Sequence, residues 1–247
     1  MQQLVEALEA RLEPTWVRKS TRVEGLERNG EGWALTAAGS RRPYDTVIIA
    51  SPAWDASALL GPVDPILSEE LRQIPYSSSI TVNLLYDETQ LGPLPRGFGF
   101  LVPASEGRSI LACTFAHRKF LGRTPTGKVV LRAFLGGVRN EAALGGSDEV
   151  LVELVRRDLM RILGERTMDS GAVPEYTKVS RWMRAMPQYA VGHQERMRRI
   201  HARLEELPGL RLAGNAYDGI GIPDCIRLGR EAALDLASEK RVLTSNF

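Results

Sequence analysis

The stretch best suited to chemistry lies near the C-terminus, from Leu210 to Arg230, and its sequence is LRLAGNAYDGIGIPDCIRLGR. It predicts a short buried strand, a turn and then a helix. Three glycines, Gly214, Gly219 and Gly221, interrupt regular structure in the turn and let its backbone approach another group closely. A helix with Pro223 and Asp224 in its first turn presents free N–H groups to a phosphate, an oxyanion or a polarised carbonyl. The alternative is an ordinary loop before a terminal helix.

Other residue types offer weaker chemistry. The histidines His117, His193 and His201 lack the spacing of a metal site, so we assign no metal. No GxSxG motif supports a serine hydrolase. The arginines between Arg196 and Arg199 suit lipid phosphates or an acidic ligand, but the solvated face of a helix is the interpretation we favour.

The dinucleotide fingerprint GxGxxG is missing. Each candidate glycine pair lacks the third glycine, and none follows a strand and opens a helix in a first βαβ unit. These pairs are Gly30-Glu31-Gly32, Gly97-Phe98-Gly99 and Gly219-Ile220-Gly221. If the chain handles a dinucleotide, the usual pyrophosphate turn is therefore not part of it.

Composition excludes several classes of protein. The hydrophobic content of 43% supports a packed core, and a net charge of +2 gives no strong attraction to nucleic acid. Cys113 and Cys225 lie far apart, so we expect no disulfide framework and a cytoplasmic protein. The longest apolar runs are too short to span a bilayer.

The N-terminal quarter predicts a helix followed by short strands. An amphipathic helix is expected over Gln2 to Leu12, without a capping residue before it, which suggests a start inside a larger protein. Asn29-Gly30 between period-two runs predicts a hairpin. The run from Tyr44 to Ala50 ends apolar and predicts a strand buried on both faces of a parallel sheet.

The rest of the chain alternates helices with a group of strands. Residues 53–74 are expected to be mostly helical. An antiparallel sheet is predicted from Ser79 to Tyr86, Gly97 to Val102, Ser109 to Ala116 and Val129 to Leu135, with a further strand from Val173 to Met183. Helices are predicted from Ser147 to Leu163, ended by Gly164, and from His193 to Leu207. In the last helix, Ile226, Ala233 and Leu236 are expected to face inward.

Several segments, taken in order, resemble the protoporphyrinogen oxidase family, flavoenzymes of haem biosynthesis. Arg211 to Ile226, followed by GREAA from Gly229 to Ala233, is similar to its C-terminal flavin motif. The segment AMPQYAVGH, Ala185 to His193, is similar to its AMPQY-x-x-GH segment, with Trp182 just upstream. Other similar segments are its GFG-x-L-x-P strand (Gly97 to Pro103), its F-x-x-R-x-P turn (Phe120 to Pro125) and its following GG (Gly136-Gly137).

The resemblance implies a mixed α/β and α+β fold of the amine-oxidase-like class. A Rossmann-type FAD-binding domain would be built from residues 1–52 and 186–247, and an antiparallel-sheet substrate domain, residues 53–185, would be inserted between them. The family's N-terminal part, with GxGxxG and the membrane-associated helical region, has no counterpart here. The chain is thus expected to be a C-terminal half.

The resemblance also implies the site residues. The turn around Gly221, Ile222 and Pro223 would lie beside the isoalloxazine ring, in a motif that includes Gly214 and Asn215, with Trp182 as a further cofactor position. Val23 matches a position near the adenine and Ala50 the end of a strand that passes the cofactor. Leu101 and Phe120 match apolar positions that sandwich the tetrapyrrole, and core packing is the alternative for both. No catalytic acid or base is assigned, because the chemistry belongs largely to the cofactor.

The activity implied is oxidation of a porphyrinogen to a porphyrin, with protoporphyrinogen IX as substrate and oxygen as acceptor. The alternatives are coproporphyrinogen III, another amine-oxidase-like substrate, and a non-catalytic half-domain. The isolated chain is expected to bind FAD weakly or not at all, to need its missing N-terminal half, and to self-associate through exposed apolar seams. The parent would be cytoplasmic, with peripheral contact to the inner face of a membrane left open.

Overall fold

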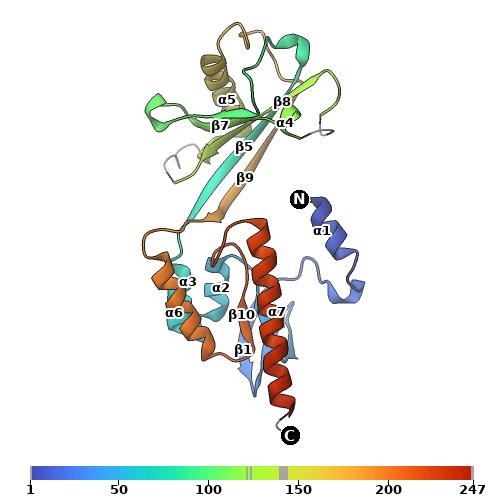
Figure 1. Cartoon of the computed structure of the whole chain (residues 1–247), viewed down its shortest axis with the longest axis vertical. Coiled ribbons are helices and arrows are strands. Elements are labelled where there is room, and N and C mark those ends of the chain that lie inside the picture. Colours follow the sequence, from blue (N-terminus) through green and yellow to red (C-terminus); the bar gives the residue numbers. More distant parts are fainter. Residues whose placement is uncertain (1, 121, 123, 139–143, 246–247) are drawn as a thin grey trace. The chain divides into compact units, whose positions relative to one another are not determined.

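The computed structural model describes residues 2–120, 122, 124–138 and 144–245, and resolves into two compact units. The first unit contains residues 1–75 and 189–247, and the second contains residues 76–188. Each unit is described by itself below (Figure 1). Leu121 and Arg123 of the expected F-x-x-R-x-P turn lie outside the described residues.

The first unit contains a three-stranded antiparallel sheet made from β1 (Val23–Asn29), β2 (Gly32–Ala37) and β3 (Ser40–Tyr44). The hairpin predicted at Asn29-Gly30 is confirmed, and Gly30 adopts a positive φ of 62°. The Trp33 side chain is fully buried, and its indole N–H donates to the Pro208 carbonyl at 3.1 Å. The hairpin is thereby tied to the C-terminal segment of the same unit.

A second sheet pairs β4 (Val47–Ile49) in parallel with β10 (Leu210–Leu212). The expectation that the run ending at Ala50 is buried on both faces is wrong. Ile49 is buried, but the side chain of Ile48 is 38% exposed. Alternate residues of a strand point to opposite faces, so only one face of this strand pair is covered within the unit.

The helices of the first unit match the expected helical regions closely. They are α1 (Gln2–Glu9), the 3₁₀ turn η1 (Pro14–Trp16), α2 (Ala53–Leu60), α3 (Pro65–Arg72), α6 (His193–Glu205) and α7 (Ile222–Ser245). Helix α1 buries none of its described residues, although Leu4, Val5 and Leu8 share a face. Its amphipathic face therefore has no partner in the described part of the unit.

Helices α3 and α6 are joined by Asp64, the N-cap of α3. Its carboxylate is only 2% exposed and accepts hydrogen bonds from the Ile66 and Leu67 amides at 3.0 Å each. The second oxygen pairs with Arg203 of α6 at 2.8 Å. One side chain thus caps one helix and fixes the position of another.

The arginine-rich face of α6 is also paired with α3. Glu70 accepts from both Arg196 and Arg199, and the Arg199 guanidinium holds the pKa of Glu70 below its usual range. The solvated face expected for the segment from Arg196 to Arg199 holds for Arg198 and Arg199, which are exposed, but not for Arg196, whose side chain is only 19% exposed and pairs with Glu70.

The second unit is an antiparallel sheet in the order β6-β7-β8-β5-β9. Its strands are β5 (Tyr76–Asp87), β6 (Gly99–Leu101), β7 (Ile110–Phe115), β8 (Lys128–Gly136) and β9 (Tyr176–Pro187). Short helical turns connect them at η2 (Glu88–Gln90), η3 (Ala104–Glu106) and α4 (Ala116–Lys119). The predicted antiparallel sheet is confirmed, and β9 runs further toward the C-terminus than Met183.

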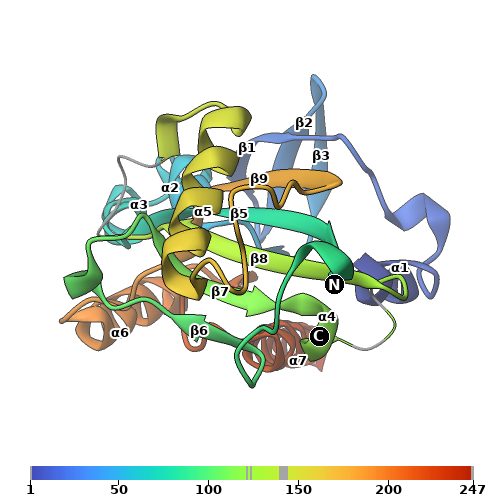
Figure 2. The same ribbon diagram turned by 90° about the horizontal axis from the view of Figure 1, so that it is seen from above.

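One face of this sheet is covered by α5 (Asp148–Leu163), as Figure 2 shows. The Ser147 hydroxyl caps the helix by accepting from the Val150 amide, and Gly164 ends it with a φ of 78°. Leu151, Val155 and Leu159 are buried against the sheet. The predicted helix and its end at Gly164 are confirmed.

The division between the units differs from the domain limits expected from sequence. Residues 53–75, expected in the substrate domain, belong to the first unit, because α2 contacts β1 and α3 contacts α6. Residues 186–188 belong to the second unit as the end of β9 and the residue after it. The assignment of cofactor and substrate to these units stays a prediction.

Among the described residues, no helix combines the length and apolar character that crossing a membrane requires.

We predict that Asp64→Ala destabilises the chain by about 2–4 kcal/mol, since it removes a helix cap and the carboxylate that pairs with Arg203. Asp64→Asn keeps an oxygen for the cap and should cost about half as much. Urea unfolding followed by circular dichroism measures both. Equal losses for the two variants would contradict the assigned role of the charge.

Candidate functional site

The turn between β10 and α7 depends on glycine for steric reasons. Gly219 adopts a φ of 142°, and a Cβ atom built on it would lie 2.4 Å from the Cβ of Asp224. Gly214 adopts a φ of 135°, and a Cβ there would meet nothing within 4 Å. Gly219 is therefore required by close packing as well as by conformation, whereas at Gly214 only the conformation requires glycine.

Helix α7 begins directly after this turn with Ile222 and Pro223. The Gly221 amide donates to the Asp224 carboxylate at 3.1 Å, which closes the first turn. The N–H groups of Ile222 and Asp224 have no acceptor within a helix that starts here, and Pro223 has no N–H. The turn thus presents free donors and the positive end of the helix dipole.

The inward face of α7 differs from the predicted one. Ala232 and Leu236 are buried, whereas Ile226 is 59% exposed and Ala233 is exposed. Leu236 was predicted correctly; Ile226 and Ala233 were wrong. The face that packs beside β10 follows an i, i+4 spacing through Ala232 and Leu236, and Ile226 lies about 120° away from Ala232 around the helix.

Two side chains of the segment from Ala185 to His193, which had no predicted role, contact the turn from one side. The Tyr189 hydroxyl accepts from the Gly219 amide at 2.9 Å and donates to the Asn215 carbonyl at 3.1 Å. The His193 ring stacks on Tyr189 with centroids 3.9 Å apart, and its Nε2 lies 3.0 Å from the Tyr217 carbonyl. The only sequence signal was their place in the AMPQY–GH segment.

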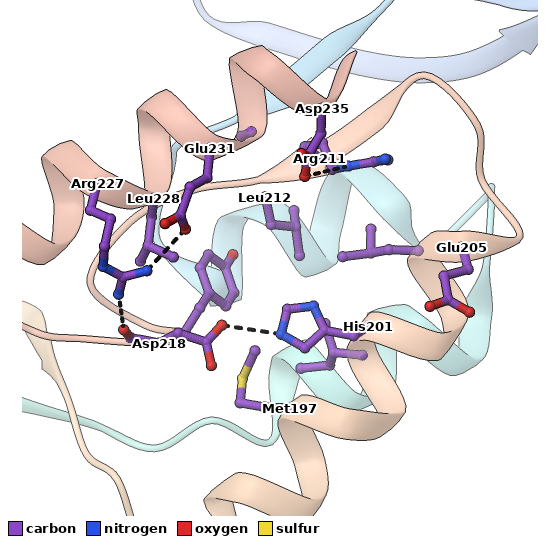
Figure 3. Close-up of a pocket in the computed structure, with 14 residues that line it drawn as sticks. Met197, His201, Glu205, Arg211, Leu212, Asp218, Arg227, Leu228, Glu231 and Asp235 are labelled. Carbon is purple, nitrogen blue, oxygen red and sulfur yellow. Dashed lines mark hydrogen bonds and ion pairs between the residues drawn. The ribbon is translucent and has the colours of Figure 1, made fainter. Parts of the chain in front are cut away.

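On another side, the turn lines a hollow of about 450 Å³ between α6 and α7 (Figure 3). His201 of α6 lies 3.1 Å from the Asp218 carboxylate, and Arg227 of α7 donates to the Asp218 carbonyl at 2.8 Å. Arg227 also pairs with Glu231 at 2.9 Å. The hydrogen bonds of Asp218 to His201 and Arg227 therefore hold the turn between the two helices.

The parallel pair β4–β10 brings the predicted cofactor positions of the first unit to one edge. Ala50 follows β4 and Gly214 follows β10, and the Ala213 amide donates to the Ile49 carbonyl at 3.0 Å. Ligands of parallel sheets bind outside the carboxyl ends of the strands. Val23 and Ala50 also line a common hollow of about 290 Å³. Asn215, Gly221, Ile222 and Pro223 lie in the same turn and helix start.

The remaining predicted positions lie in the second unit and are not placed relative to the turn. Trp182 lies on β9 and is 54% exposed. Leu101 lies on β6 with 83% of its side chain exposed, and Phe120 follows α4 and is 38% exposed. These exposures disagree with core packing for Leu101. The roles of all three stay predictions.

The described residues contain no group of His, Cys, Asp and Glu side chains placed to hold a metal ion. The start of α7 offers hydrogen-bond donation from the backbone N–H groups of Ile222 and Asp224.

We predict that Gly219→Ala destabilises the chain by about 2–4 kcal/mol, because the new Cβ collides with Asp224 and the φ of 142° is strained for alanine. The matched control is Gly229→Ala inside α7, where a Cβ meets nothing within 4 Å and should stabilise by about 0.5–1 kcal/mol. Thermal unfolding of both variants measures the difference. A stable Gly219→Ala protein would count against the turn geometry.

Comparison with known proteins gives matches over almost the whole chain. The chain is 32% identical to coproporphyrinogen III oxidase of Bacillus subtilis, covering 95% of this chain and 49% of that protein. It is 29% identical to the chloroplastic protoporphyrinogen oxidase of Nicotiana tabacum, covering 82% of this chain and 37% of that protein. The chain therefore spans about half of the length of the Bacillus subtilis protein and less than half of the Nicotiana tabacum protein.

Comparison with solved structures also gives matches over almost the whole chain. A crystal structure from Exiguobacterium sp. 255-15, provisionally named protoporphyrinogen oxidase, matches with a TM-score of 0.82 and 33% identity over 97% of this chain and 51% of that one. A putrescine oxidase matches with a TM-score of 0.71 but 17% identity, which shows the fold alone. The family described as flavin containing amine oxidoreductase matches residues 1–237. The chain therefore belongs to the flavin-containing amine oxidoreductase family.

Proposed function

We propose that this chain forms part of the cofactor and substrate sites of an FAD-dependent porphyrinogen oxidase of haem biosynthesis. The observation that carries the proposal is the glycine turn at the carboxyl edge of β4 and β10, which leads into α7 in a chain of the flavin-containing family. The substrate is a porphyrinogen, the product a porphyrin, and oxygen the acceptor. The relatives named for porphyrinogens support the substrate class.

The residues of the first unit fit the flavin end of FAD. The free N–H groups of Ile222 and Asp224 suit negative charge that develops at the pyrimidine side of the ring. Gly214 leaves open space beside the backbone, so a flat group can approach it. When bound, FAD supplies the chemistry, since it accepts hydride equivalents from the methylene bridges of the porphyrinogen. The chain's own residues orient the ring and exclude water.

Other positions complete the proposed assignment. Val23 and Ala50 line an apolar hollow near the same sheet and would contact the adenosine side of the cofactor, with Trp182 as a further contact. Leu101 and Phe120, exposed on the second unit, would hold the flat tetrapyrrole. We assign the cofactor mainly to the first unit and the substrate mainly to the second.

The partners and location follow from the same proposal. The chain works with the part of its relatives that it does not span, because the GxGxxG turn for the pyrophosphate is not in it. The location proposed for the parent protein is the cytoplasm. Exposed apolar side chains on α1 and α7 favour self-association of the chain alone.

We predict that the chain alone binds FAD weakly or not at all, because it holds the ring end of the site without the pyrophosphate turn. The purified protein should be colourless, and FAD titration should leave flavin fluorescence nearly unchanged. Stoichiometric flavin, measured by its visible absorbance, would contradict this prediction.

We predict activity when the chain is co-expressed with the complementary half of the Bacillus subtilis relative. The flavin-loaded complex should turn a non-fluorescent porphyrinogen into a fluorescent porphyrin. Parallel assays with protoporphyrinogen IX and coproporphyrinogen III decide which one is preferred.

Leu101→Asp should raise KM by about tenfold or more, since it places a charge where a flat apolar substrate is proposed to lie. The control is Val138→Asp, an exposed apolar position of the same unit. A flavin-loaded complex that forms no porphyrin from either substrate would refute the proposal.

A further inference from the structure

We propose that Tyr189 and His193 are positioning residues that preset the turn of residues 214–221 for the flavin ring, before any cofactor is bound. This inference rests on the proposed function, because it assigns the turn to the flavin. It adds a role for two side chains that hydrogen-bond to the backbone of the turn. Their role is to fix the backbone from which the cofactor contacts arise.

The Tyr189 hydroxyl links two backbone groups on opposite arms of the turn. It accepts from the Gly219 amide at 2.9 Å and donates its only proton to the Asn215 carbonyl at 3.1 Å. One oxygen atom therefore joins both arms of the turn. Burial raises the pKa of Tyr189, so the phenol keeps the proton that it donates.

His193 packs against the ring of Tyr189 and also makes its own contact with the turn. Its ring is stacked on the Tyr189 ring at an angle of 14° and is 8% exposed. Because the partner of Nε2 is the Tyr217 carbonyl at 3.0 Å, Nε2 must carry a proton. The middle of the turn is thus held by His193, and its two ends are held by Tyr189.

The bridge also decides which donors remain for a ligand. The Gly219 amide is used by the phenol and the Gly221 amide by Asp224, so neither is available to a ligand. The amides of Ile222 and Asp224 at the start of α7 are left without an intrahelical acceptor. A site that is already in its bound geometry binds without a further ordering cost. Loss of the Tyr189 hydroxyl should therefore loosen the turn without removing a cofactor contact.

The first test uses the chain by itself and needs no flavin. Tyr189→Phe keeps the stacked ring and removes the hydroxyl, and Tyr44→Phe on β3 is the matched control. Amide hydrogen exchange at Gly219 should be about three- to tenfold faster in Tyr189→Phe and unchanged in Tyr44→Phe. The ¹⁵N spectrum of His193 should show a proton on Nε2. Unchanged exchange at Gly219, or a proton on Nδ1 alone, would overturn the proposal.

The second test separates positioning from simple structural support. His193→Phe keeps the ring and loses the donor, whereas His193→Gln restores an N–H donor. In the flavin-loaded complex with the complementary half, Tyr189→Phe and His193→Phe should shift the flavin absorbance, and His193→Gln should restore it in part. A flavin spectrum identical to wild type in all variants would overturn the positioning role. Absence of porphyrin formation by the unaltered complex would instead count against the proposed function, with the exchange result still standing.

Discussion

The steric constraint at Gly219 is the condition on which the rest of the candidate site depends. Its backbone passes so close to Asp224 that no Cβ fits, and its φ of 142° is open to glycine. This close approach lets Asp224 accept from the Gly221 amide and start α7 at Ile222. The direction of the helix, and thus of its free N–H groups, follows from one residue without a side chain.

The turn is held by segments that lie far apart along the chain. Tyr189 and His193 come from the start of the C-terminal segment, and β4, which pairs with β10, comes from residues 47–49. On the other side, His201 and Arg227 hold Asp218. A loop with so many fixed backbone groups costs little to order when a ligand binds. Each of these contacts restricts the conformational freedom that the glycines bring to the segment.

Prediction from sequence is correct where structure is decided locally. Asn29-Gly30 favours a tight hairpin by its φ preference, and Ser147 with Gly164 marks both ends of α5. It failed at Ile48 and Ile226, which are apolar but exposed. Hydrophobic pattern indicates which residues could be covered, but burial requires a second surface, and neither side chain is covered within its unit.

The sequence by itself determined the class of fold, the strand–turn–helix of Leu210 to Arg230 and the order of motifs that resembles a flavin-dependent family. These follow from backbone preferences and residue types, which act over a few neighbours. The tertiary structure alone decided that residues 53–75 join the first unit, that α7 packs through Ala232 and Leu236, and that Tyr189 bridges Asn215 and Gly219. Such contacts join residues distant in sequence, so their partners become defined only when the packed unit has formed.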